Sequence, residues 1–139
     1  AITAERDAEE REHALRSLGV APGQAVPAAL RSQIKALEDD QKRRATRSLR
    51  DGIDRILVDL SSLYRDVLLL QVGAEIDLVN VELRPELDRA AEAASPAQTL
   101  ATLDAIALAR ERIEGNVAPA LALESMLVSA ARGRAEARR

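Results

Sequence analysis

Hydrophobic side chains recur along residues 49–70 at alternating intervals of four and three, which is the spacing of one buried face of an α-helix. Three further residues, Leu57, Tyr64 and Leu68, widen this stripe, so we expect other helices to cover it from more than one side. The pattern predicts the central helix of a helical bundle. The residues of the stripe are Leu49, Ile53, Ile56, Leu60, Leu63, Val67 and Leu70.

The sequence before residue 49 contains few residues that would end the central helix, so the helix is expected to begin well before that residue. After Pro27 the next proline is Pro85, and Gly73 stands where a helix-ending glycine is expected. Residues 38–48 are polar, and their acids precede their bases by one helical turn, which supports an exposed helix. We therefore predict one long helix over about residues 28–72, whose polar middle joins a small N-terminal hairpin to the main bundle. The expected pairs are Glu38 with Lys42, Asp39 with Arg43, and Asp40 with Arg44.

Helix signals also mark the segments on either side. We expect a first helix capped by Thr3, a short helix over residues 85–93, a helix capped by Ser95 with Gln98, and a last helix capped by Asn116. The connector after Gly73 is expected to pack onto the bundle through Ile76, Leu78, Val79, Val81 and Leu83. The fold class predicted is all-α, a bundle of five to six helices.

The domain organisation expected from these elements is a single helical domain over residues 1–139. Residues 1–26 are a lead-in helix and a Gly/Pro linker, residues 27–132 are the bundle, and residues 133–139 are a frayed tail.

The composition argues against catalysis. There is no cysteine, and the single histidine, His13, lies among charged residues, so neither a histidine-based triad nor a multi-histidine metal site can form. No glycine-rich phosphate loop is present, and only Glu124 stands in an apolar run where burial is expected. We predict no enzymatic activity, no catalytic residue, no cofactor and no metal site.

The lack of cysteine and of an apolar run long enough for a bilayer favours a cytoplasmic protein without a membrane partner.

A basic cluster interrupts a chain whose net charge is −3 at pH 7. Residues 41–50 carry five positive charges and no acid, and Arg43, Arg47 and Arg50 share a helix face. Three interpretations are a solvated face, a contact with an acidic partner subunit, and direct contact with DNA. The acidic chain, the lack of aromatic residues for stacking bases and the acids one turn earlier favour the solvated face and argue against DNA contact. Arg43, Arg47 and Arg50 stay candidates for a partner interface.

The last helix is apolar almost all round, so it is either central to the bundle or partly covered by another chain. Tyr64 and Met126 are expected in the core. Candidate interface residues in the last helix are Leu121, Leu123, Met126, Leu127 and Val128.

Two segments carry specific motifs. Within residues 101–130, an N-V-x-P turn beginning at Asn116 precedes an L-A-L-E-x-x-L helix that ends at Leu127. Within residues 36–74, an acidic-then-basic stretch precedes a D-R-x-L-V-D-L-x-x-x-Y-R-D-V-L run. Together they resemble the C-terminal domain of the bacterial DNA polymerase III clamp-loader subunits. The second segment resembles the delta-prime subunit of actinobacteria in particular.

The resemblance implies a non-catalytic oligomerisation domain, the collar, that holds the delta-prime subunit in the pentamer that places the sliding clamp on DNA. Its partners would be the gamma/tau and delta subunits. The ATPase-type and lid modules would lie outside these residues, with residues 1–26 leading from the lid. Two alternatives stay open, namely the equivalent collar domain of the gamma/tau subunit and a free-standing helical adaptor that associates with itself. The isolated chain could also form a homodimer.

Overall fold

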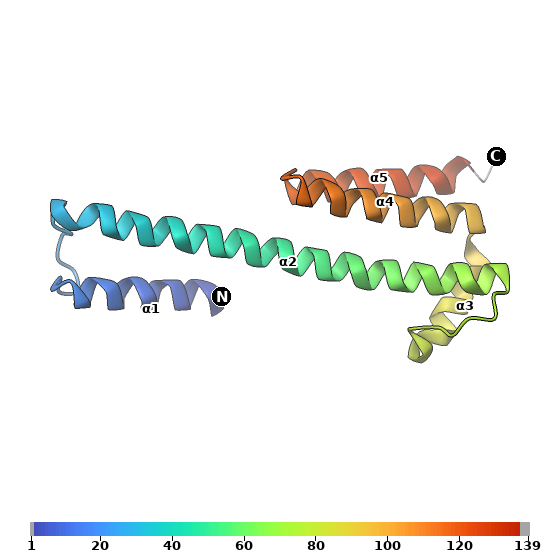
Figure 1. Ribbon diagram of the computed structural model, residues 1–139, viewed down its shortest axis with the longest axis horizontal. Coiled ribbons are helices and arrows are strands. Elements are labelled where there is room, and N and C mark those ends of the chain that lie inside the picture. The colour runs from blue at the N-terminus through green and yellow to red at the C-terminus, as the bar shows by residue number, and fades with distance from the viewer. Residues whose placement is uncertain (1, 137–139) are drawn as a thin grey trace. The chain divides into compact units, whose positions relative to one another are not determined.

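The computed structural model describes residues 2–136, and every regular element in that range is helical. The predicted all-α class with one long central helix is confirmed. The helices are α1 (Ile2–Ser17), α2 (Arg31–Val72), α3 (Arg84–Ala93), α4 (Pro96–Glu114) and α5 (Pro119–Glu136), as drawn in Figure 1. Short 3₁₀ helices, Ala28–Leu30 and Val81–Leu83, precede α2 and α3.

The chain divides into two compact units, and the division falls inside α2. Unit 1 is Ala1–Leu49 and unit 2 is Arg50–Arg139. The polar middle of α2 stays helical, as predicted. At the other end, α5 continues to Glu136, so the expected tail from residue 133 begins as helix, and its last residues, 137–139, lie outside the described range.

Unit 1 is a hairpin in which α1 lies antiparallel to the first half of α2 (Figure 1). Near the turn, the side chains of Val20 and Ile34 are buried. Farther from the turn the contact is polar, because Gln41 Nε2 donates to the backbone oxygen of Asp7 at 3.0 Å and to Glu10 Oε2 at 3.1 Å. The two helices are therefore joined largely by hydrogen bonds and charges.

The predicted charge pairs within α2 are wrong, because α1 supplies other partners for Glu38 and Arg44, and Arg43 pairs with a different acid of α2. Glu38 accepts from Arg11 Nε at 3.1 Å, and Arg44 forms an ion pair with Glu10. Arg43 pairs with Asp40, one turn before it, at 3.8 Å. Hydrogen bonding from Gln41, followed by the charge of Arg44, lowers the pKa of Glu10.

Residues with positive φ close the C-terminal ends of α1, α2 and α4. Gly19, Gly73 and Asn116 have φ values of 78°, 65° and 66°, and in each case the next N–H donates to the carbonyl five residues before it, which is a Schellman motif. Asn116 therefore ends α4 and does not cap α5, which is a correction to the prediction. Thr3 is likewise not a cap, since α1 already includes Ile2.

The N-terminus of α4 has the predicted capping box. The backbone N–H of Gln98 donates to Ser95 Oγ at 3.3 Å, and the N–H of Ser95 donates to Gln98 Oε1 at 2.8 Å. This arrangement satisfies two N–H groups that a helix start would otherwise leave without a partner.

The core of unit 2 lies between the second half of α2 and the helices α4 and α5. Tyr64 and Met126 both belong to it, as predicted. The predicted stripe on α2 is confirmed in part, because Val67 is buried and Ile53 and Leu60 pack against the core, but Leu49 and Ile56 are exposed and Leu57 is buried instead. The reason is that the core residues of α4 and α5 meet α2 on the side of Leu57. The buried residues are Leu57, Ala105, Ile106, Ala109, Ile113, Ala122 and Met126, and Ile53, Leu60, Tyr64 and Leu123 pack against them.

We predict that Ile106→Ala lowers the free energy of unfolding by about 2–4 kcal/mol, because it leaves a cavity in the core. Leu108→Ala is the matched control on the same helix, since Leu108 is 43% exposed where Ile106 is 1% exposed. The control should change stability by no more than about 0.5 kcal/mol. Urea unfolding followed by circular dichroism measures both, and equal effects would contradict the orientation of α4.

Candidate subunit interface

Helix α5 divides the candidate interface residues into two groups. Leu121, Leu127 and Val128 are exposed, whereas Met126 is buried in the core and Leu123 is half-buried against it. We call the three exposed residues the α5 surface. A buried Met126 contributes to an interface only by supporting its neighbours, because its own side chain has almost no contact with solvent.

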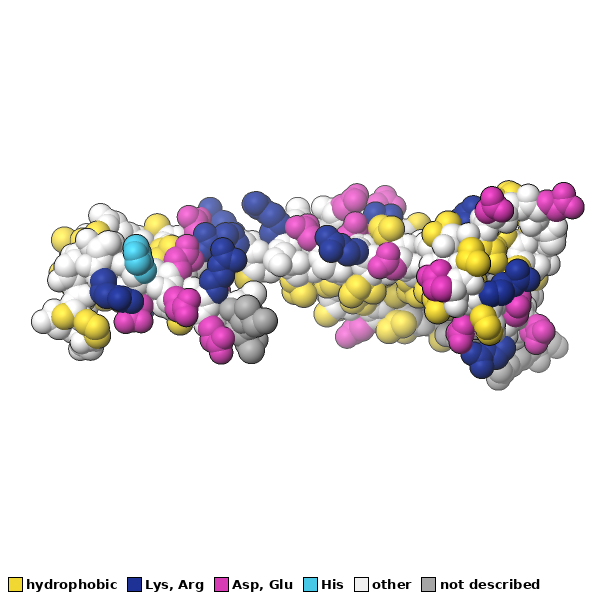
Figure 2. Space-filling model, turned by 90° about the horizontal axis from the view of Figure 1, so that it is seen from below, with side chains coloured by type: hydrophobic (Ala, Val, Ile, Leu, Met, Phe, Trp, Pro, Cys, Tyr) yellow, Lys and Arg dark blue, Asp and Glu magenta, His cyan; other side chains and the backbone are white. Residues whose placement is uncertain are grey.

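The contacts of α5 explain why these side chains stay outside. Ala122 and Met126 lie on the side that packs into the core, and Arg112 Nη1 of α4 donates to Ser125 Oγ at 2.6 Å on the adjoining flank. A helix that is apolar almost all round cannot bury every side when its neighbours lie on one side only. In Figure 2 hydrophobic side chains gather in a band on the face of unit 2 that this view shows.

Two polar contacts hold α4 on one flank of α2. Arg110 Nε donates to Asp54 Oδ1 at 2.7 Å, and Arg50 Nη1 donates to Asn116 Oδ1 at 2.8 Å. The hydrogen bond and charge of Arg110 lower the pKa of Asp54, and Asp54 in return raises the pKa of Arg110. With about 3.6 residues per turn, Ile56 lies on the opposite flank of α2, where it is 66% exposed.

The three arginine candidates have different surroundings. Arg43 and Arg47 are exposed in unit 1, and within residues 2–136 Arg47 has no ion pair. Arg50 belongs to unit 2, where its contact with Asn116 makes it part of the fold. The arginines therefore do not act as one uniform basic face.

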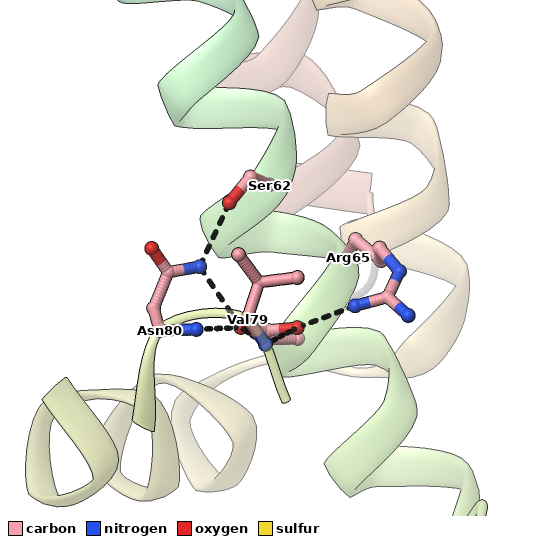
Figure 3. Close-up of polar contacts among 5 residues, drawn as sticks. Ser62, Arg65, Val79 and Asn80 are labelled. Atoms are coloured by element: carbon pink, nitrogen blue, oxygen red, sulfur yellow. Dashed lines mark hydrogen bonds and ion pairs between the residues drawn. The ribbon is translucent and has the colours of Figure 1, made fainter. Parts of the chain in front are cut away.

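The residue that the sequence analysis missed is Asp66 on α2, whose side chain is 0% exposed. It accepts hydrogen bonds from the backbone N–H of Val79 at 3.0 Å, the backbone N–H of Asn80 at 2.8 Å and Asn80 Nδ2 at 2.9 Å. Arg65 Nη1 adds an ion pair at 2.8 Å, and Asn80 Nδ2 also donates to Ser62 Oγ at 2.8 Å (Figure 3). Asp66 therefore holds residues 79 and 80 of the connector, which runs from residue 74 to residue 83, against α2. The carboxylate expected to be buried, Glu124, is instead exposed.

The contacts of Asp66 explain a further correction, which concerns the connector. Ile76, Val79, Val81 and Leu83 were expected to pack onto the bundle, but all four are exposed, and only Leu78 is half-buried. Hydrogen bonds to a buried carboxylate hold this segment in place, so its apolar side chains are not needed for its attachment. The sequence signal was weak, because the donors to Asp66 lie 13 and 14 residues away from it.

The balance of forces on Asp66 favours its charged form. Burial by itself would raise the pKa of this carboxyl, but the hydrogen bonds from Asn80 and Val79 and the charge of Arg65 outweigh burial and lower it. Asp66 therefore acts as an ionised structural anchor, because its oxygen atoms are occupied by donors.

The described residues offer little for reaction chemistry. Within residues 2–136, no three His, Cys, Asp or Glu side chains are grouped so that they could hold a metal ion. His13, drawn in cyan in Figure 2, is exposed on α1. Among the described helices, none has both the length and the apolar character needed to cross a bilayer.

The fold and its exposed residues define an all-α domain that keeps apolar side chains on its surface around a small aliphatic core. Residues 9–131 match the family described as DNA polymerase III, delta subunit, C terminal. The chain belongs to this family of clamp-loader C-terminal domains, which is non-catalytic in itself and implies other clamp-loader subunits as partners. No curated protein and no solved structure matches the sequence.

We predict that Asp66→Asn lowers the free energy of unfolding at pH 7 by about 2–4 kcal/mol, because buried N–H donors lose a charged acceptor. Asp88→Asn is the matched control, since Asp88 pairs with Arg84 at 2.9 Å on the surface. The control should cost no more than about 1 kcal/mol. Urea unfolding of the two variants and the wild type measures the difference.

The effect of Asp66 should also depend on pH. Its pKa is lower in the folded chain than its ordinary value of 3.8, so its stabilisation is complete above that value and is lost as the pH falls through the folded-state pKa. The stability difference between the wild type and Asp66→Asn should therefore stay constant from pH 7 to about 5 and shrink below about 4. A difference that is independent of pH would contradict an ionised anchor.

Proposed function

We propose that this chain is the collar domain of a delta-prime subunit and that it holds this subunit in the replicative clamp loader without taking part in catalysis. Its neighbours in the assembly would be the gamma/tau and delta subunits in the cytoplasm. The match of residues 9–131 to the family described as DNA polymerase III, delta subunit, C terminal supports the part of the proposal that makes this chain a clamp-loader C-terminal domain. The choice of delta-prime over delta or gamma/tau is supported by the resemblance of residues 36–74 alone.

The α5 surface is the part of the domain that we assign to subunit contact. Leu121 and Val128 are separated by two helical turns, so they project from the same side of α5. Both are exposed, although each would gain about 1.5–3 kcal/mol if fully buried against a partner. Ala122 and Met126 already complete the core from the other side, so the outward side is available to another protein. Such an arrangement suits a helix that packs into the core of its own domain on one side and against a partner subunit on the other.

We predict that the double variant Leu121→Ser with Val128→Ser weakens binding to the partner subunits by at least about 30-fold, because it replaces two apolar side chains that would be buried against the partner, each worth about 1.5–3 kcal/mol on full burial. The helical content should stay unchanged, since both side chains are exposed. Size-exclusion chromatography with the delta and gamma/tau subunits, at several concentrations, measures assembly.

Leu100→Ser is the control for this prediction. Leu100 is exposed to a similar extent near the start of α4, outside the α5 surface. It should assemble as the wild type does. Assembly of the α5 variant at wild-type concentrations would contradict the assignment of this surface.

A further inference from the structure

The connector between α2 and α3 presents apolar side chains to solvent although it is firmly attached. Ile76, Val79 and Val81 are between 56% and 65% exposed, and Leu83 is exposed as well. Four exposed aliphatic residues within eight positions are more than a loop needs, since isolated surface hydrophobic residues are normal but gathered ones mark contact sites.

The same segment is held in one conformation by bonds at its middle. Asp66 accepts the N–H groups of Val79 and Asn80, and the Asn80 side chain also reaches Ser62 (Figure 3). At the end of α3, Gln71 Nε2 donates to the backbone oxygen atoms of Ala91 at 3.2 Å and Ala94 at 2.7 Å. A loop fixed in this way loses little conformational entropy on binding, which is what a docking segment requires.

The charges around these apolar residues have one sign. Glu75, Asp77 and Glu82 alternate with them, are exposed, and form no ion pair within residues 2–136. The arginines that follow already have partners, since Arg84 binds Asp88 and Arg89 binds Glu86. The connector therefore exposes apolar side chains that are bordered by unpaired carboxylates, and a partner would contact both.

We infer that residues 75–83 form a second docking surface, which binds a protein surface with an apolar centre and a border of Lys and Arg. The occupant is another clamp-loader subunit, so this inference rests on the proposed function. A second copy of this chain is a poor occupant, because self-pairing would bring the acids of two connectors together. Nucleic acid and anionic membranes are repelled by the same acids. The connector lies on α2 and α3, whereas the α5 surface lies on another helix, so the two surfaces contact different parts of the assembly.

The test uses the full chain immobilised for biolayer interferometry, with the purified delta and gamma/tau subunits as separate probes. The apolar variant is Ile76→Ser with Val81→Ser, and the charge variant is Glu75→Gln, Asp77→Asn and Glu82→Gln. All five side chains are exposed, so both variants are expected to fold. The apolar variant should bind one of the two subunits at least about 10-fold more weakly. The charge variant should associate about 3–10-fold more slowly with that subunit and lose its salt dependence, because steering by the carboxylates is removed.

The outcomes separate this inference from the proposed function. If both connector variants bind each subunit as the wild type does, while Leu121→Ser with Val128→Ser does not, the inference is overturned and the proposed function stands. If the wild type binds neither subunit, the proposed function is overturned and the inference with it. A third outcome is that the apolar variant binds weakly while the charge variant associates as fast as the wild type. That outcome would overturn the inference that Lys and Arg border the partner's surface.

Discussion

Helix α2 and its neighbours carry more apolar surface than the domain can bury, and this imbalance governs the rest of the structure. The core includes Leu57 because residues of α4 and α5 pack on that side of α2, where Arg110 also pairs with Asp54. Ile56, on the other flank, and the outward residues of α5 then have no neighbour within unit 2. A domain with one aromatic residue builds its core from aliphatic side chains, and its helices leave the surplus on the outside.

The connector shows how a segment can be fixed without using its apolar side chains. Asp66 replaces apolar burial with hydrogen bonds to an ionised carboxylate, which are stronger than bonds between neutral groups. The burial of a charge is costly unless donors surround it, and here Val79, Asn80 and Arg65 supply them. As a result, Ile76 and Val81 stay available for other contacts. In this short segment, hydrogen bonds to Asp66 provide the attachment, and the apolar side chains remain on the surface.

The helices could be predicted from the sequence because their signals are local. The spacing of apolar residues placed α2, and Ser95 with Gln98 placed the start of α4, since both depend on positions within one or two turns. What could not be predicted depends on neighbours that are distant in sequence. An apolar stripe does not say which flank will be covered, so Ile56 was misplaced. Glu38 and Arg44 of α2 have partners on α1, and Asp66 accepts hydrogen bonds from the connector; the spacing of residues along α2 does not predict either set of contacts.

Hydroxyl-radical footprinting tests the central claim most directly, because it compares the solvent access of the same side chains in the chain alone and in the assembly with delta and gamma/tau subunits. The surplus apolar surface should become covered on assembly, so oxidation of Leu121, Leu127 and Val128 should fall while that of Leu100 stays unchanged. If the α5 residues are oxidised equally in the two states, the exposed surface of unit 2 does not serve assembly, and the account is contradicted.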